Sequence, residues 1–273
     1  MNIRKLPDIT FINLTNQPMN KQTENRTALI DLELILYRNA AKAEAEGTNL
    51  RDLVSMTNLS IREVVDGCQA ANYYLVVSGT DNFRKTLYPE TYKAGRPPKP
   101  PLYNDLYMEI QATYGAKRFK WHDQIEADDL LGIMLTNGRV ENPILCSIDK
   151  DMLGIPGWHY NWNKDAWPTY VSQAEADHHW LVQLLTGDST DGIRGMEGIG
   201  PVKANKLIKK YRSIMDLQSV PEMAKYIYEK EEIDLDRFYE TLYLVSIWRA
   251  DMPEELLAND LIASIVKTIP SIK

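Results

Sequence analysis

Residues 142–152 read NPILCSIDKDM, a short apolar run that ends on acidic residues. A continuous apolar run of this length, bounded by polar residues, is typical of a strand that is buried on both faces. Asp149 and Asp151 stand two positions apart, so in an extended chain both side chains lie on one side while Lys150 points away. The stretch therefore predicts a buried strand that brings two carboxylates to one place.

Further apolar runs predict the other strands of the same sheet. They are ALID at 28–31, YYLVVSG at 73–79, RFKWH at 118–122 and GWHYNW at 157–162. Helical patterns lie between them: one ends at Gly47, one begins at Ser60 with Glu63 completing a capping box, and one covers 125–138. Because strands that alternate with helices favour parallel pairing, we expect an α/β fold with a mostly parallel central sheet flanked by helices.

The pattern divides the chain into three parts. Residues 1–26 are largely polar and predict a weakly held N-terminal extension, to which we assign no role. The α/β core is expected over 27–171, and the helical pattern of 172–273 predicts an all-helical region. Within the core, residues 82–116 begin with a basic and aromatic stretch broken by prolines. A connection this long inside an α/β pattern usually carries function.

Composition limits the classes of protein that fit. The 273 residues are 44% hydrophobic and 25% charged, which provides a packed core and argues against general disorder. Because no apolar run approaches the roughly 20 residues that span a bilayer, we expect no membrane partner. Cys68 and Cys146 stand in apolar surroundings and predict buried thiols in a reducing compartment, the cytoplasm.

Nine acidic residues form the main candidate site. Four follow predicted strands, at the edge of a parallel sheet where ligands collect, three begin the helix in IEADD, and two stand in TGDSTDG. They are Asp31, Asp81, Asp149 and Asp151; Glu126, Asp128 and Asp129; and Asp188 and Asp191. Any one of these groups alone could be only a helix cap or a turn.

Gathered in one place, these carboxylates would repel one another unless cations neutralised them. Oxygen ligands suit Mg²⁺ or Mn²⁺, whereas the four histidines form no zinc pattern, because His178 and His179 are adjacent on a predicted helix. Removing nine carboxylates from the net charge of −7 leaves +2, so the remaining surface is mildly basic. The sequence therefore predicts a magnesium or manganese site on a molecule that can also bind an anion.

The long connection supplies cations and an aromatic ring. TYKAGRPP contains Tyr92, Lys93 and Arg96, and Arg84 and Lys85 precede it. A lysine can balance phosphate charge, an arginine can bind phosphate through two hydrogen bonds, and a tyrosine can stack on a base. The alternative is an ordinary solvated basic loop.

A glycine-rich stretch follows the last acids. In MEGIGPVKANKLI, Gly198 and Gly200 allow backbone N–H groups to approach phosphate oxygens, and the helix that begins after them adds its positive end. Lys203 and Lys206 extend the positive face. This arrangement favours binding to the DNA backbone without regard to sequence.

Together these segments resemble the 5′-nucleases, a family that includes flap endonucleases, phage 5′→3′ exonucleases and the nuclease domain of bacterial DNA polymerase I. The resemblance runs from about Leu29 to about Tyr211. It rests on LID with a following LYR, FRKTLYPETYKAGRPPKP, IEADDLLG, SIDKDM and TGDSTDGIRGMEGIGPVKA. The segments ADHHW and GDSTDG are most similar to those of the exonucleases of T7-type phages, and this similarity indicates a phage origin.

The resemblance implies a two-metal site, with a role for each matching residue. The first metal would be held by Asp31, Asp81, Glu126, Asp128 and Asp149, with Asp129 adjoining. The second would be held by Asp151, Asp188 and Asp191. Lys93 and Arg96 would act on the scissile phosphate from a helical arch near 82–116, and Tyr92 would stack on a base. Catalysis would rest chiefly on Lys93, Arg96, Asp31 and Asp149.

The family also implies how DNA is held. A helix–three-turn–helix motif at about 188–212 would anchor the duplex, through Gly198, Gly200, Lys203 and Lys206, with K⁺ bound by carbonyls at 189–200. Arg84, Lys85 and Tyr92 would contact the DNA from the arch side. Two features depart from the family: the spacing from Asp81 to Phe83 is short, and residues 1–26 have no counterpart.

We therefore expect a monomeric, metal-dependent 5′→3′ exonuclease or 5′-flap endonuclease that acts in DNA replication or recombination. Its substrate would be duplex DNA with a 5′ end or flap, and RNA in RNA–DNA hybrids is also compatible. Two other classes stay open. One is a ribonuclease of the related PIN-like α/β group, and the other is a duplex-DNA-binding module that does not cut.

Overall fold

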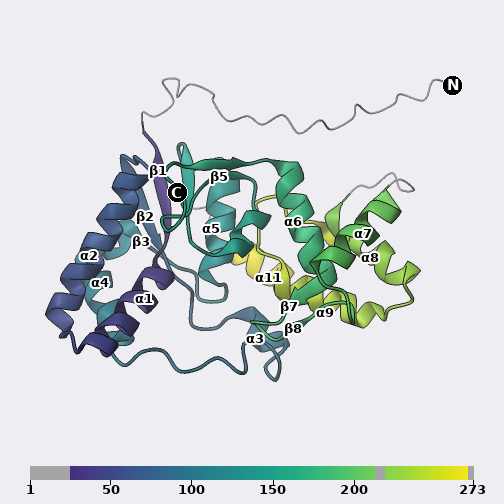
Figure 1. Ribbon diagram of the computed structural model, residues 1–273, viewed down its shortest axis with the longest axis horizontal. Helices are drawn as coiled ribbons and strands as arrows, with labels where there is room; N and C mark the ends of the chain where they lie inside the picture. Colours follow the sequence, from purple (N-terminus) through teal and green to yellow (C-terminus); the bar gives the residue numbers. More distant parts are fainter. Residues whose placement is uncertain (1–24, 213–218, 270–273) are drawn as a thin grey trace.

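The computed structural model describes residues 25–212 and 219–269, so the predicted N-terminal extension lies almost wholly outside the described residues. Within them, six strands form one sheet in the order β3-β2-β1-β4-β5-β6 (Figure 1). The strands are β1 Thr27–Asp31, β2 Asn72–Val76, β3 Phe119–Lys120, β4 Pro143–Cys146, β5 Gly157–Tyr160 and β6 Thr169–Val171. All neighbouring pairs are parallel except β5 and β6, so the predicted mostly parallel α/β sheet is confirmed.

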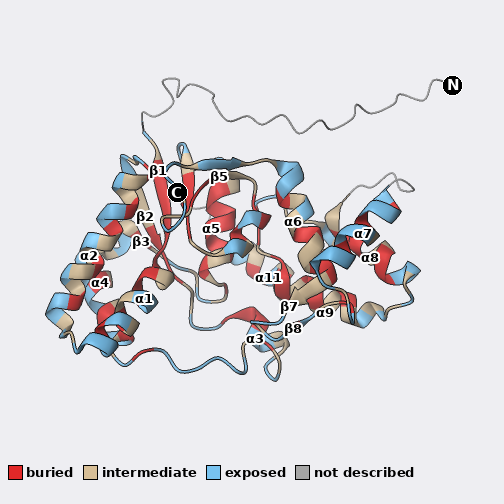
Figure 2. Ribbon diagram, viewed as in Figure 1, coloured by how far each residue is buried: buried red, intermediate tan, exposed pale blue. Residues whose placement is uncertain are grey.

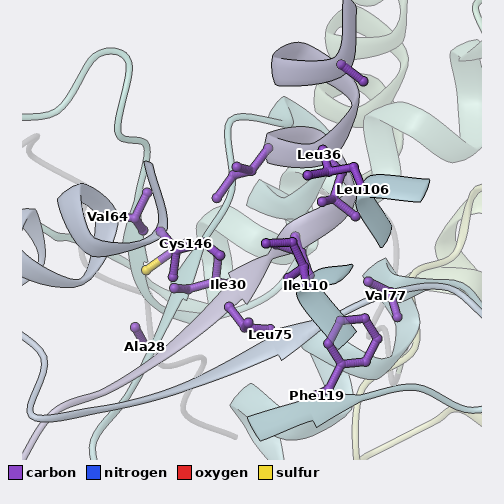
Figure 3. Packing of buried hydrophobic residues seen from close by; sticks show 14 of the residues in the cluster. Ala28, Ile30, Leu36, Val64, Leu75, Val77, Leu106, Ile110, Phe119 and Cys146 are labelled. Atoms are coloured by element: carbon purple, nitrogen blue, oxygen red, sulfur yellow. The ribbon is translucent and has the colours of Figure 1, made fainter. Parts of the chain in front are cut away.

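The central strands are apolar because helices cover both of their faces. Along β1, Ala28 and Ile30 enter one core and Leu29 enters the other, as the alternation of a strand requires. In β4, Cys146 faces the first core, which also contains Leu106 (Figure 3). The central strands β1 and β4 are buried almost throughout, and β1 is red in Figure 2. The buried sheet therefore holds in fixed positions the residues that follow the ends of its central strands.

Three helices cover the first face: α1 Leu32–Glu46, α2 Leu50–Gly67 and α4 Tyr103–Arg118. Helix α1 ends at Gly47 in the left-handed conformation with φ 69°, as predicted. The predicted start of α2 at Ser60 is wrong. Asn49 caps α2 by accepting from Asp52 N, and Ser60 lies inside the helix, where its hydroxyl donates to the Met56 carbonyl.

The second face is covered by α5 Ala127–Thr136 together with α11 Asp260–Thr268 from the end of the chain. The remaining C-terminal helices pack around a core of their own. They are α6 Gln173–Thr186, α7 Pro201–Arg212, α8 Val220–Lys230 and α9 Leu235–Val245, followed by the short α10 Glu254–Leu257. A small hairpin, β7 Gly187–Asp188 and β8 Ile193–Arg194, interrupts the predicted helical pattern.

Two connections lead to the candidate site. The short helix α3 Phe83–Leu87 and the segment 88–102 join β2 to α4, and this segment runs along the lower edge of Figure 1. A 3-10 turn, η1 Lys150–Gly154, follows β4. No described helix is both long enough and apolar enough to cross a membrane.

Candidate active site

The first acids of the site meet where β1 and β4 end. These strands are parallel, with Ile30 beside Cys146, so Asp31 and the residues after Cys146 reach the same edge of the sheet. Ser147 joins the two ends: its hydroxyl donates to Asp31 Oδ2 at 2.9 Å and accepts from Asp149 N at 3.1 Å. Asp149 in turn accepts from Asp151 N at 2.9 Å.

Electrostatics shows that several acids converge here. Burial, together with the charges of Glu33 and Asp149, raises the pKa of Asp31 to about 7, against a lowering hydrogen bond from Ser147. Burial and the charges of Asp31, Asp149 and Glu126 raise the pKa of Asp128 well above its usual value. These carboxylates are close enough to destabilise one another's ionised forms, so the predicted grouping of strand-end and helix-start acids is present.

The second group of acids joins the first from the β7–β8 hairpin. Burial and the charges of Asp149 and Asp188 raise the pKa of Asp151 to about 7. The hairpin is held against the 88–102 segment, because Lys93 N donates to the Asp191 carbonyl at 2.9 Å. Gly192 has φ 75°, and a Cβ there would lie 2.6 Å from the Thr91 carbonyl oxygen, so the close contact requires glycine.

A cavity lies between these elements, and we call it the acidic pocket. Its polar lining comes from the 88–102 segment and α3, the start of α5, η1, α6 and the hairpin. These polar residues are Arg84, Tyr92, Lys93, Glu126, Asp128, Asp151, Gln183, Asp188 and Asp191. Acids that are far apart in the sequence therefore face one shared volume.

The two cations predicted to act on phosphate lie at this pocket. Lys93 Nζ is 2.5 Å from Glu126 Oε1 and 3.6 Å from Asp191 Oδ2, so its ammonium bridges acids assigned to different metals. Arg96 Nη2 is 2.5 Å from Asp191 Oδ1. Lys93 has φ 55°, a left-handed conformation that is unusual for a residue with a side chain.

Tyr92 does not lie where a base could stack on it. Its ring is only 3% exposed and belongs to the core of the C-terminal helices, and its hydroxyl donates to Glu126 Oε2 at 2.5 Å. Burial and the Glu126 charge raise the pKa of Tyr92 well above its usual value. The predicted stacking role is therefore contradicted, because the faces of the ring are covered by protein.

Arg84 and Asp129 form a buried ion pair rather than a DNA contact and a metal ligand. Arg84 is 2% exposed and binds Asp129 through Nη1 and Nη2 at 2.6 and 2.7 Å. Arg84 also donates to the Leu244 and Ser246 carbonyls, and Asp129 accepts from Trp248 N. Since both groups are saturated inside the protein, the DNA-binding role predicted for Arg84 and the metal-adjoining role predicted for Asp129 are wrong.

Asp81 is exposed, and unlike Asp31 and Asp149 it is not one of the charges that raise the pKa values of the clustered acids. The backbone after β2 turns toward another segment: Gly79 N donates to the Ile125 carbonyl and Asp81 N to the Asp123 carbonyl. This position gives no support to its predicted role as a metal ligand, which stays a prediction.

Three polar residues of the site were not predicted: Ser147, which joins Asp31 to Asp149, and two others. Glu33 lies in the first turn of α1, contributes to the raised pKa of Asp31, and accepts from Ser78 at 2.8 Å. Its place two residues after a strand-end acid was a usable signal. Gln183 lines the acidic pocket from α6, and only tertiary packing brings it there.

The predicted DNA anchor lies on the surface beside the hairpin. Gly198 and Gly200 are exposed, Gly198 has φ 68°, and Pro201 begins α7 directly after them. Lys203 and Lys206 are exposed on α7, and Lys203 Nζ donates to the Gly198 carbonyl at 2.8 Å. Lys85 is also exposed. These positions are accessible to a phosphate backbone, and their contact with DNA stays a prediction.

The donor set of the pocket fits hard divalent cations. Among the described residues, no three Asp, Glu, His or Cys side chains are arranged so that they could hold a metal ion as they stand. However, the carboxylates raise one another's pKa values, and the Lys93 ammonium bridges Glu126 and Asp191. Carboxylates that gather and require a positive charge are the ligands that Mg²⁺ and Mn²⁺ prefer.

Comparison with known proteins agrees with this site. A family model described as the 5′-3′ exonuclease, N-terminal resolvase-like domain, matches residues 26–180, which is more than half of the chain. The chain belongs to the 5′-3′ exonuclease family. Within this family, it is 33% identical over 150 residues to the flap endonuclease Xni of Shewanella frigidimarina, covering 50% of this chain and 57% of that relative.

Another relative in the 5′-3′ exonuclease family is the exonuclease of Escherichia phage T7, which is 29% identical over 136 residues, covering 46% of this chain and 44% of the phage protein. The chain thus spans about half the length of these curated relatives. A flap endonuclease of bacteriophage T5, solved with DNA and metal ions, superposes with a TM-score of 0.57 at 16% identity, covering 90% of this chain and 98% of that one. The fold is therefore that of a 5′ nuclease.

Proposed function

We propose that this chain is a metal-dependent 5′→3′ exonuclease and 5′-flap endonuclease that hydrolyses phosphodiester bonds of DNA. The observation that carries the proposal is the acidic pocket, where acids from separate segments meet Lys93 and the hairpin that leads to an exposed glycine turn. Membership of the 5′-3′ exonuclease family supports the same activity. DNA replication and recombination are the processes that this chemistry serves.

Two Mg²⁺ or Mn²⁺ ions are the cofactors that we assign to the acidic pocket together with the adjoining ends of β1 and β4, where Asp31 and Asp149 lie. Asp31, Glu126, Asp128 and Asp149 would hold the first ion, and Asp151, Asp188 and Asp191 the second. When bound, such ions activate a water for attack on phosphorus and stabilise the leaving 3′-oxygen. Relative to the sequence-based set, Asp81 and Asp129 are left out because of where they lie.

The residues of this chain act on the substrate phosphate through charge. Lys93 and Arg96 now neutralise Glu126 and Asp191, and the same cations would face the scissile phosphate once these acids hold metal. Positive groups placed against the charge that develops on phosphorus stabilise the transition state. Both residues lie on the 88–102 segment, so the position of this segment would determine how closely they approach the substrate phosphate.

Duplex DNA would be held away from the pocket. Gly198 and Gly200 would present backbone N–H groups to phosphates, and Lys203 and Lys206 would add charge along α7. We assign a K⁺ site to the carbonyls of 189–200, and the single-stranded 5′ end to the 82–116 region. The protein would act as a monomer on DNA in the cytoplasm, which is the host cytoplasm if the gene is carried by a phage.

The test is cleavage of a 5′-flap duplex and a recessed-end duplex, each labelled at either end in turn. We expect Mg²⁺-dependent release of short 5′ fragments or 5′-nucleotides. Full cleavage in EDTA, or release only from 3′ ends, would contradict the proposal. The same assay separates the two other classes, because a PIN-like ribonuclease would cut RNA in preference to DNA and a binding module would bind the duplex without products.

A further inference from the structure

The hydroxyl of Tyr92 is hydrogen-bonded to a carboxylate of the acidic pocket. It donates to Glu126 Oε2 at 2.5 Å, and Arg84 Nη1 donates to the same oxygen at 3.3 Å. The other oxygen, Oε1, accepts from the ammonium of the Lys93 side chain at 2.5 Å. Glu126 therefore has one oxygen held by two donors from the protein interior and one oxygen that faces the Lys93 ammonium in the acidic pocket.

Both donors to Oε2 are fixed by packing. The Tyr92 ring lies in the core formed by the C-terminal helices, with Leu184 and Ile193 in the same cluster. Arg84 is fixed by its bidentate pairing with Asp129. Neither donor can follow Glu126 if its side chain rotates, so the carboxylate is restricted to one orientation.

We propose that Tyr92 is a positioning residue that orients Glu126 for metal binding, by holding Oε2 so that Oε1 points to the cation. This inference rests on the proposed function, in which Glu126 is a metal ligand. Outer groups that hydrogen-bond a ligating side chain fix its orientation, and their loss costs about 10- to 100-fold in metal affinity. Tyr92 thus connects the core of the C-terminal helices to the metal site.

The competing role, stacking on a base, makes the opposite prediction for a simple substitution. Tyr92→Phe keeps the ring and removes only the hydroxyl. If Tyr92 stacked on DNA, this variant would behave like the parent protein. If Tyr92 orients Glu126, the variant loses the hydrogen bond to Glu126 Oε2 while the ring still packs in the core, so metal binding should weaken.

The experiment is calorimetric titration of the full chain with Mn²⁺ alone, in the absence of DNA. We expect Tyr92→Phe to weaken Mn²⁺ binding by about 10-fold or more. The matched control is Tyr88→Phe, because Tyr88 packs against the same helical core but does not line the acidic pocket, and its affinity should stay within about twofold. Melting curves in EDTA verify that each variant is folded.

A double-variant comparison with Glu126→Gln separates this inference from the proposed function. If Tyr92 acts through Glu126, Tyr92→Phe adds less than about twofold in the Glu126→Gln background, since the two sites share one interaction. If Glu126→Gln weakens Mn²⁺ binding and Tyr92→Phe does not, the inference is wrong and the metal site stands. If Glu126→Gln leaves Mn²⁺ binding unchanged, Glu126 is not a ligand, and the ligand assignment falls together with the role of Tyr92.

Discussion

At the scale of single residues, acids with similar sequence contexts differ in what surrounds them. Asp128 and Asp129 are neighbours on α5, but Asp129 is saturated by Arg84 and Trp248 N, whereas Asp128 mainly faces other acids. Asp129 is fully buried and both of its oxygens accept from donors in the protein interior, so neither oxygen is free for a metal. Surroundings, more than position in a motif, therefore decide which acids are ligands.

The contrast between Asp128 and Asp81 can be measured. We expect Asp128→Asn to lower Mg²⁺-dependent cleavage by on the order of 10²-fold or more, because a metal ligand is removed. Asp81→Ala should stay within about twofold of the parent protein, since exposed side chains away from the site have small effects. Initial rates on a 5′-flap substrate check both. A large decrease in Asp81→Ala would return this residue to the site.

Lys93 provides a second prediction at this scale. Lys93→Ala should lower kcat by about 10²-fold, because a positive group at the reacting phosphate is removed. Duplex affinity in EDTA should change by less than about threefold. Lys117→Ala is the control, because Lys117 is exposed near the end of α4 and does not line the acidic pocket. Equal decreases of kcat and affinity would mean that Lys93 only binds DNA.

At the scale of elements, the Arg84–Asp129 pair joins three parts of the chain. Arg84 lies in α3, Asp129 lies in the first turn of α5, and the Leu244 and Ser246 carbonyls belong to the end of α9 and the residue after it. The pair thus holds the start of the 88–102 segment against the helix that carries Asp128. It is a structural junction behind the acidic pocket.

Breaking this junction should destabilise the protein. Arg84→Met leaves the Asp129 charge buried without its partner, and removing one member of a buried pair costs about 3–5 kcal/mol. The free energy of unfolding from urea titration measures the decrease. Arg139→Met is the control, because Arg139 is exposed and should change the stability by no more than about 0.5 kcal/mol. A similar small effect of Arg84→Met would show that the pair contributes little.

The elements that the sequence predicted well are those with a single dominant signal. The apolar runs in ALID at 28–31 and in the 142–152 stretch are continuous, and they became β1 and β4 at the centre of the sheet. Strand β6 was missed because it is a short edge strand with mostly exposed residues, including Tyr170. The start of α2 was misplaced because Asn49 and Ser60 both carry capping signals and only packing selects between them.

In the candidate site, the sequence predicted which acids come together but not which side chains point into the protein. Residue type and spacing identified the acids that meet at Asp31 and Asp149, because strand ends in a parallel sheet must share one edge. Spacing could not show that Arg84 and Tyr92 point inward, since their partners are 45 and 34 residues away. The division of the chain at residue 171 stays a prediction, although Ile262 and Ile265 complete the core of the sheet.

At the scale of the whole molecule, the folded state gathers charges of one sign. Asp31, Asp128 and Asp151 all have raised pKa values, so ionising them at neutral pH destabilises the fold. A cation bound among these acids would relieve the repulsion, so we expect metal binding and folding to be coupled.

This coupling predicts opposite effects of one substitution in two buffers. In EDTA, Asp128→Asn should melt at a higher temperature than the parent protein, because a repelled buried charge is removed. With Mg²⁺ at about 100 times its Kd, the parent protein should gain about 2.7 kcal/mol, and the variant should gain less. Scanning calorimetry in both buffers checks this. A variant that melts lower in EDTA would refute the repulsion.

The surface on α7 predicts how DNA binding depends on salt. Lys203→Ala combined with Lys206→Ala should weaken duplex binding to a similar degree for every sequence. It should also reduce the slope of log affinity against log salt by about 1 for each phosphate that the variant no longer neutralises. Binding isotherms in EDTA at several salt concentrations measure both quantities. An unchanged slope would move the DNA anchor elsewhere, and Lys164→Ala serves as the exposed control.

The contact between the β7–β8 hairpin and the 88–102 segment has a consequence for gene exchange. Lys93 N binds the Asp191 carbonyl, and Gly192 leaves room for Thr91, so each segment is shaped for the other. The two lie about a hundred codons apart in the gene. A crossover between them would join segments from different parents, and a graft of one loop alone would bring the wrong partner. Both are therefore expected to be inherited as one unit, and a chimera should be built with the two exchanged together.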